Sequence, residues 1–120
     1  MSPEELRQRT KQFTLRVMKV VAALPETAQG RVISYQLMKA GSSVAANYRA
    51  VCRARSRKDF INKLGVVIEE ADESAFWLEV IAEGEVLKPV LVEALQREAN
   101  EIVAIMTAAR CTALRLKPKE

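Results

Sequence analysis

The sequence contains no histidine, and this absence removes several kinds of active site. Histidine is the commonest general base near neutral pH, the partner of serine in catalytic triads and a usual ligand in di-iron helical bundles. The two cysteines, Cys52 and Cys111, do not form a CxxC pair and predict neither a zinc site nor a disulfide scaffold. We therefore expect buried, reduced thiols, no cofactor and no enzymatic activity.

Other features are scarce as well. Aromatic residues make up 5% of the 120 residues, and glycine and proline occur four times each, whereas 49% are hydrophobic. This composition predicts a folded, helical chain held together by aliphatic packing. Apolar runs are only a few residues long, far short of the roughly 20 that cross a bilayer, and the Met1–Glu5 start is unlike a secretory leader. We expect a cytoplasmic protein without membrane contact.

The first half of the chain predicts two helices separated by a turn. The Ser2–Glu5 segment has a serine cap, a proline at the first helical position and a carboxylate three residues after the cap. Apolar residues then follow helical spacing over roughly residues 3–24. Residues 25–30 predict a turn, and a second apolar stripe continues through about Ala54.

The second half predicts two more helices. Ser56 with Asp59 three residues later is typical of a helix start, and Gly84 is typical of an end. Between them the apolar stripe has strict four- and three-residue intervals: Phe60, Leu64, Val67, Ala71, Ser74, Leu78 and Ile81. Lys88-Pro89 opens a fourth helix that fades before Pro118.

Four helices of roughly 22–27 residues joined by short turns predict an all-α protein, an antiparallel up-down-up-down four-helix bundle. Residues 1–120 form one domain in this interpretation. Very few residues separate the second and third helices, so these two could also run as one long bent helix or exchange between subunits.

The Gly41-Ser42-Ser43 stretch allows two chemical interpretations, and packing is favoured over both. A phosphate-binding loop needs the pattern GxxxxGK[ST] after a strand, but here one glycine lies within a helical pattern. A serine nucleophile would depend on Lys39, four residues before Ser43, with no oxyanion hole nearby. A glycine inside a helix instead lets another helix approach closely.

Acidic residues gather on the third predicted helix, at Glu69, Glu70, Asp72 and Glu73. Carboxylates can bind metals, but without histidines a structural polar network is the favoured interpretation. Glu70, Glu73 and Trp77 share one helical face, from which Glu73 could reach Asn47 or an arginine of the second helix.

Charge is divided unequally along the chain. Residues 1–58 hold 12 Lys or Arg and 3 acids, a net +9, whereas residues 59–120 hold 7 and 12, a net −5, which together give the overall +4. Basic residues concentrate where the second helix ends and the third begins: Arg49, Arg53, Arg55, Arg57 and Lys58. Opposite charges could orient assembling subunits, and the basic end could bind a phosphate backbone. A run of surface charge can also be merely solvated.

Three groups of residues between Gln36 and Ile81 carry a resemblance to a known family. They are Ser42, Ser43, Ala45, Ala46 and Asn47; then Arg53, Ser56, Asp59 and Phe60; then Glu70, Glu73, Ser74, Trp77 and Leu78. The segment resembles the four helix bundle proteins related to those encoded in intervening sequences of bacterial 23S ribosomal RNA. It covers over a third of the chain, and the flanking helices agree only in pattern.

The family is similar in fold to the accessory variability determinant of diversity-generating retroelements, a homopentamer that binds nucleic acid and a reverse transcriptase. The resemblance implies a pentameric bundle with no enzymatic activity. Our own interpretation of the helical pattern assigns Ser43, Asn47, Glu70, Glu73 and Trp77 to structure or assembly.

Our hypothesis is a homo-oligomer that binds RNA or DNA through phosphate contacts and assists a reverse transcriptase. No aromatic platform accompanies the basic residues, so such binding should be salt-sensitive and indifferent to sequence. A protein interaction scaffold without nucleic-acid binding is the alternative. An enzyme that uses the acidic residues of the third helix would contain stoichiometric metal.

Overall fold

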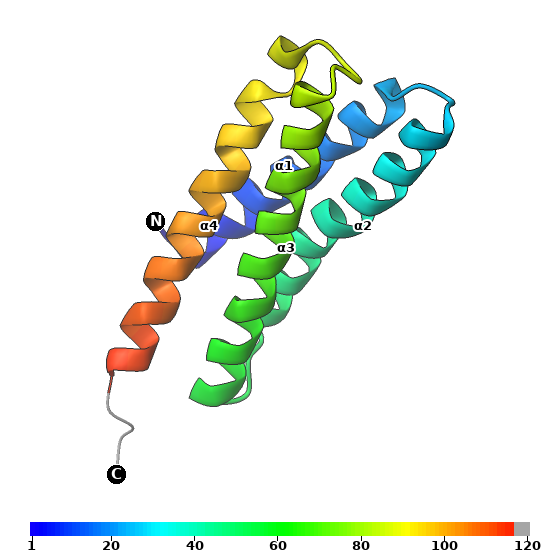
Figure 1. The fold of residues 1–120 in the computed structure, drawn as a ribbon. Helices are drawn as coiled ribbons and strands as arrows, with labels where there is room; N and C mark the ends of the chain where they lie inside the picture. Colours follow the sequence, from blue (N-terminus) through cyan, green and yellow to red (C-terminus); the bar gives the residue numbers. More distant parts are fainter. Residues whose placement is uncertain (117–120) are drawn as a thin grey trace.

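The protein is a bundle of four long helices in a computed structural model that describes residues 1–116. The elements are α1 (Pro3–Ala23), α2 (Ala28–Val51), α3 (Arg57–Glu83), the short 3-10 helix η1 (Pro89–Leu91) and α4 (Glu93–Arg115). Successive helices run in opposite directions, and no strand occurs in the described part of the chain (Figure 1). The predicted antiparallel four-helix bundle is confirmed. Pro118, expected to lie just beyond the last helix, falls outside the described residues.

The predicted caps of α1 and α3 are present. The backbone N–H of Glu5 donates to the Ser2 hydroxyl at 3.1 Å, and the N–H of Asp59 donates to the Ser56 hydroxyl at 3.0 Å. Each bond satisfies one of the free N–H groups in the first helical turn. The sequence signals therefore locate both helix starts.

Two helix starts differ from the predictions. α2 begins at Ala28, inside the segment predicted as a turn, because the Thr27 hydroxyl accepts a hydrogen bond from the N–H of Gly30 at 3.0 Å and caps the helix early. Pro89 opens the 3-10 helix η1 rather than an α-helix, and α4 follows from Glu93.

A sharp break separates α2 from α3. α2 ends at Val51, and the next helix starts at Arg57 after a turn over residues 52–56. The alternative of one continuous bent helix is therefore wrong.

The core is aliphatic and is shared by all four helices. Its largest fully buried side chains include Phe13 of α1, Leu37 of α2, Leu78 of α3 and Met106 of α4. The heptad pattern of α3 places six of its seven residues in the interior, and Phe60 packs partly buried against the core. The predicted apolar stripe is therefore the face that α3 turns inward.

Gly41 lies at a close approach between α1 and α2. A Cβ atom on this residue would lie 2.7 Å from Cγ1 of Val17, and the Thr14 hydroxyl donates to the Gly41 carbonyl at 2.7 Å. The structure confirms that Gly41 serves helix packing.

The prediction of buried cysteines is wrong. Cys52 and Cys111 are both free thiols, and both are exposed. Val51, not Cys52, fills the last core position of α2, because the apolar stripe continues three residues after Tyr48 rather than four.

Candidate nucleic-acid interface

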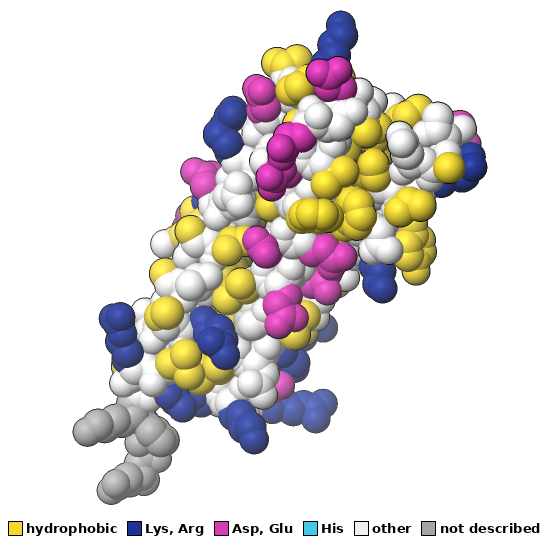
Figure 2. Space-filling model, in the orientation of Figure 1, with side chains coloured by type: hydrophobic (Ala, Val, Ile, Leu, Met, Phe, Trp, Pro, Cys, Tyr) yellow, Lys and Arg dark blue, Asp and Glu magenta, His cyan; other side chains and the backbone are white. Residues whose placement is uncertain are grey.

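The basic residues predicted from sequence lie at the end of the bundle where α2 passes into α3. Figure 2 shows Lys and Arg side chains gathered at this lower end and acidic side chains along α3 above it. A cavity of about 600 Å³ opens here, which we call the corner cavity, and its lining is Ala46, Arg49, Ala50, Arg53, Arg55, Asp59 and Lys63. Three of the five predicted basic residues therefore share one cavity.

The end of α2 and the turn after it bring the arginines together. Arg49 lies in the last turn of α2, and Arg53 lies in the turn, where its backbone N–H donates to the carbonyl of Ala50 at 3.1 Å. The turn that follows brings Arg55 against the first turn of α3, where its backbone N–H donates to Oδ2 of Asp59 at 3.1 Å. The chain reversal thus brings Arg55 to the two arginines at the end of α2 and in the turn.

The one acid in the corner cavity is already engaged. Nζ of Lys63 lies 2.9 Å from Oδ2 of Asp59, and this hydrogen bond, followed by the one from the Arg55 backbone, lowers the pKa of the Asp59 carboxyl. Asp59 stays ionised and satisfied by these two donors. Within residues 1–116, Arg49, Arg53 and Arg55 form no ion pair, so their guanidinium groups are available to an outside anion.

Arg57, unlike the arginines of the corner cavity, binds the end of another helix. Its guanidinium donates to the carbonyl of Ala113 at 2.7 and 3.1 Å and to that of Leu114 at 3.3 Å. These carbonyls belong to the last turn of α4, which lacks helical N–H partners and carries the negative end of the helix dipole. Arg57 therefore caps α4, while Lys58 is exposed and lies outside the corner cavity lining.

Sequence reasoning missed Lys63 and the role of Asp59 beyond its helix-start signal. Lys63 follows Asp59 by four residues, the spacing of a helical ion pair, and this was the available signal. The contact between Arg57 and α4 had no such signal, because 56 residues separate its partners along the chain.

The residues predicted to serve structure or assembly do not form one network. The Ser43 hydroxyl donates to the Lys39 carbonyl at 2.8 Å, and the Asn47 amide donates to the Ser43 carbonyl at 2.8 Å, so both bond within α2. Asn47 is half-buried. Glu73 forms no hydrogen bond or ion pair in the described part of the chain, so the expected link to Asn47 is absent there.

The polar side chains that are fully buried are others, Thr10 and Ser74. Each donates to a carbonyl of its own helix, at 2.8 Å to Leu6 and to Glu70 respectively. Glu70 is half-buried, and its burial, with the nearby charge of Glu73, raises the pKa of its carboxyl.

Trp77 and Phe76 form an aromatic pair on α3. Their ring centroids are 5.0 Å apart at an interplanar angle of 76°, an edge-to-face arrangement. Trp77 Nε1 is buried without a hydrogen-bond partner among residues 1–116, whereas the Phe76 side chain is 52% exposed. An exposed aromatic ring therefore projects from the acidic face of α3.

A second surface feature lies toward the opposite end of the bundle, where α1 passes into α2. A cavity of about 660 Å³, which we call the apolar cavity, is lined by Val21, Ala22, Leu24, Pro25, Glu26, Arg31, Ser34, Tyr35, Met38, Lys39 and Ser42. Its walls are mainly apolar, and two cations, Arg31 and Lys39, join them with one acid, Glu26.

Among residues 1–116, no three cysteine, aspartate or glutamate side chains gather closely enough to hold a metal ion. None of the described helices combines the length and apolar character needed to span a bilayer.

The fold and the corner cavity together define a four-helix bundle with a cationic end. The chain belongs to the 23S rRNA-intervening sequence protein family, whose model matches residues 4–108. It is similar to a crystal structure of a protein of unknown function from the S23 ribosomal protein family of Bacteroides thetaiotaomicron, with 28% sequence identity and a TM-score of 0.84. That similarity covers 92% of this chain and 99% of the other. A search of curated proteins found no match.

Proposed function

We propose that the protein is a non-enzymatic binder of RNA or DNA that grips the phosphate backbone through the corner cavity. The observation that carries this proposal is the meeting of Arg49, Arg53 and Arg55 in one cavity. Asp59, the one acid among the described lining residues, is already paired. Guanidinium groups bind phosphate oxygens through two parallel hydrogen bonds, and such contacts do not depend on base sequence. The name of the family refers to intervening sequences of 23S rRNA and so connects its members with nucleic acid.

Electrophoretic mobility shifts at several salt concentrations test this proposal. We expect binding of unrelated sequences with similar affinity, which weakens steeply with salt because counterions are released. A triple charge reversal, Arg49→Glu, Arg53→Glu and Arg55→Glu, should lower the affinity by roughly a hundredfold or more.

The matched control moves the same charge change to the other end of the bundle. The control triple is Lys19→Glu, Lys88→Glu and Arg97→Glu. These exposed cations lie near the end of α1, just before η1 and in the second turn of α4. An equal loss in both triples would show that only net charge matters. Absence of wild-type binding at low salt would leave the interaction scaffold as the better function.

We propose in addition that the protein assembles with copies of itself through unlike surfaces. Phe76 is surrounded on α3 by exposed acids at helical neighbour positions, Asp72, Glu73 and Glu79. The apolar cavity offers a mainly apolar lining with Arg31 and Lys39. The two surfaces match in polarity and charge, and a contact between unlike surfaces can close into a ring.

A mixture of two variants, each with one contact surface disrupted, tests this assembly. Phe76→Asp removes the exposed aromatic ring of α3, and Tyr35→Asp places a charge in the lining of the apolar cavity. Each variant alone should therefore be monomeric by light scattering. An equal mixture should form a dimer, because each chain still supplies one intact surface. A monomeric wild-type protein, or a mixture that stays monomeric, would contradict the proposal.

The number five and a reverse transcriptase partner are the finer parts of the proposal, and they rest on the resemblance alone. A wild-type mass other than five chains would remove the first. The reverse transcriptase partner would be ruled out if no reverse transcriptase gene lies beside the gene of this protein. It would also be ruled out if the purified protein does not retain the enzyme that such a gene encodes.

A further inference from the structure

A second, smaller cavity adjoins the corner cavity on the α1 side of α2. It has a volume of about 370 Å³, and we call it the flank cavity; its lining is Glu4, Arg7, Gln8, Lys11, Ala45, Ala46 and Arg49. Ala46 and Arg49 line both cavities, so the two are neighbours that meet at Arg49. A path lined by cations therefore runs from the start of α3 across α2 onto α1.

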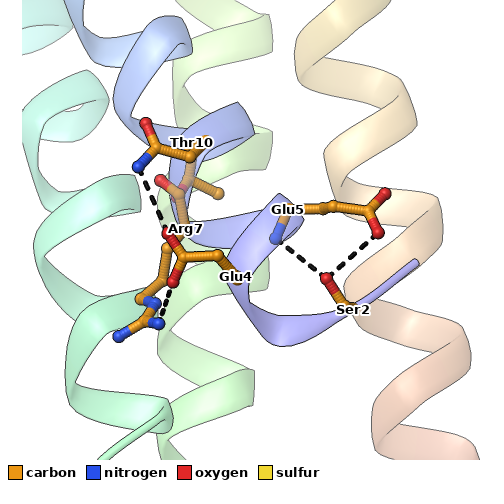
Figure 3. A network of polar contacts seen from close by, with 6 residues as sticks. Ser2, Glu4, Glu5, Arg7 and Thr10 are labelled. Atoms are coloured by element: carbon orange, nitrogen blue, oxygen red, sulfur yellow. Dashed lines mark hydrogen bonds and ion pairs between the residues drawn. The ribbon is translucent and has the colours of Figure 1, made fainter.

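The Glu4 carboxylate is bound to two polar side chains of the flank cavity, Arg7 and Gln8. One of its oxygens pairs with the Arg7 guanidinium, and the other accepts a hydrogen bond from the Gln8 amide at 3.3 Å. Figure 3 shows Glu4 facing Arg7, while the neighbouring Glu5 turns toward Ser2. Both members of the ion pair are exposed, with 47% of the Arg7 side chain and 61% of the Glu4 side chain accessible, so the pair can open at little cost.

We infer that the flank cavity is a second phosphate subsite in which Glu4 takes the place of a phosphate until nucleic acid binds. The bound phosphate would receive hydrogen bonds from Arg7 and Gln8 and face the Lys11 ammonium, and Glu4 would turn to solvent. This inference rests on the proposed function, because Arg49 is the residue that joins the subsite to the corner cavity.

The lining of the two cavities indicates double-stranded nucleic acid as the ligand. Proteins that hold single strands usually stack bases on aromatic side chains, and neither lining contains an aromatic residue. A duplex keeps its bases inside and presents closely spaced phosphates, with one charge per roughly 1.7 Å of helix axis in DNA. Successive cationic cavities suit that surface.

The variant Glu4→Gln tests the role of the carboxylate. Removing the internal anion should raise the affinity for a short RNA duplex by about threefold, because an exposed ion pair no longer has to open. Glu5→Gln is the matched control, since it makes the same charge change one residue later in the same helical turn, outside the cavity lining. Equal gains in the two variants would overturn the inference.

Two further variants test the phosphate contacts. Arg7→Gln and Lys11→Gln should each weaken duplex binding by roughly tenfold at moderate salt and reduce the salt slope by about one. The gain from Glu4→Gln should vanish in the Arg7→Gln background. Thermal unfolding of every variant excludes loss of fold as the cause.

The outcomes separate this inference from the proposed function. If the corner triple abolishes binding but Arg7→Gln and Lys11→Gln leave the affinity and the salt slope unchanged, the flank subsite is wrong and the corner cavity stands. If a single strand of the same sequence binds as tightly as the duplex, the choice of ligand is wrong. If the wild-type protein binds neither, both proposals fail.

Discussion

The two helical hairpins of this bundle, α1–α2 and α3–α4, differ in how their helices meet and in what they show to solvent. α1 and α2 come close enough at Gly41 that a Cβ atom would collide with Val17. In the second hairpin the glycine of α3, Gly65, meets no such obstacle, because a Cβ atom there would lie 3.6 Å from Nε of Arg110. The first hairpin belongs to the basic part of the sequence and the second to the acidic part.

This difference shows that packing and surface charge are set by separate residues. Both hairpins contribute to one apolar core, and the three arginines of the corner cavity belong to no ion pair among residues 1–116. Charge on the outside can therefore be changed without rebuilding the inside. The predictions below test this separation, beginning with the largest effect.

Gly41→Ala should destabilise the protein by about 2 kcal/mol in urea unfolding. Overpacking against Val17 outweighs the better helix propensity of alanine, which is worth about 1 kcal/mol. Gly65→Ala is the control in the second hairpin, because its Cβ would lie 3.6 Å from Nε of Arg110, an ordinary contact. It should be neutral or stabilising, and equal losses at both glycines would refute the difference in helix approach.

Arg57→Gln and Arg55→Gln should have opposite consequences. Loss of the Arg57 bonds to the carbonyls of Ala113 and Leu114 should cost about 1.5 kcal/mol of stability and leave duplex affinity nearly unchanged. Arg55→Gln should leave the unfolding midpoint in place and weaken nucleic-acid binding about tenfold. Unfolding and binding are measured on both variants. The two results decide whether Arg57 serves stability while Arg55 serves nucleic-acid binding.

Glu98→Gln should remove about 1 kcal/mol of stability at neutral pH, by breaking the ion pair that joins the hairpins. Arg9 lies 2.7 and 2.8 Å from the two Glu98 oxygens, and its hydrogen bonds lower the pKa of that carboxyl. Because the folded pKa is the lower one, this stabilisation is present above the unfolded value of about 4.5 and is lost as the pH falls through the folded pKa.

The acid limb of the stability curve provides the measurement for this pair. The wild-type protein should lose stability more steeply than Glu98→Gln as the pH drops. Glu101→Gln is the control, because Glu101 contacts the same arginine at 2.8 Å but its side chain is 64% exposed, against 14% for Glu98. A larger loss in Glu101→Gln would contradict the assignment.

Glu79→Gln should slightly stabilise the protein at neutral pH, the smallest effect of the series. A hydrogen bond shared with Glu83 raises the pKa of Glu79, so the folded state holds a proton more readily than the unfolded state. Stability at this site is therefore gained as the pH falls through the raised pKa, opposite to Glu98. Melting temperatures at neutral pH and near pH 4 should show the gain only at neutral pH.

Much of the fold could be predicted because its signals are local. The heptad of α3, the Ser2 and Ser56 caps and the packing role of Gly41 each depend on residues within a few positions of one another. The early start of α2 was missed because a threonine cap inside a Pro- and Gly-bounded segment resembles an ordinary turn.

The candidate site was only partly predictable, because its contacts depend on which ends of the helices meet. Sequence proximity groups Arg57 with its basic neighbours, and only the antiparallel arrangement brings it to the end of α4. Similarly, Arg7 and Lys11 are more than 30 residues from Arg49, and the pairing of α1 with α2 places them beside it. The expected burial of the cysteines failed because Cys52 comes one residue after the end of the apolar stripe.

The edge-to-face pair on α3 also gives the protein a built-in optical reporter. Trp77 is the single tryptophan of the chain, so tryptophan emission comes from one known position beside Phe76. A neighbouring copy that covered Phe76 would change the surroundings of that indole, whereas duplex binding at the basic end would leave them unaltered. Concentration-dependent emission could therefore separate self-association from ligand binding in unlabelled protein.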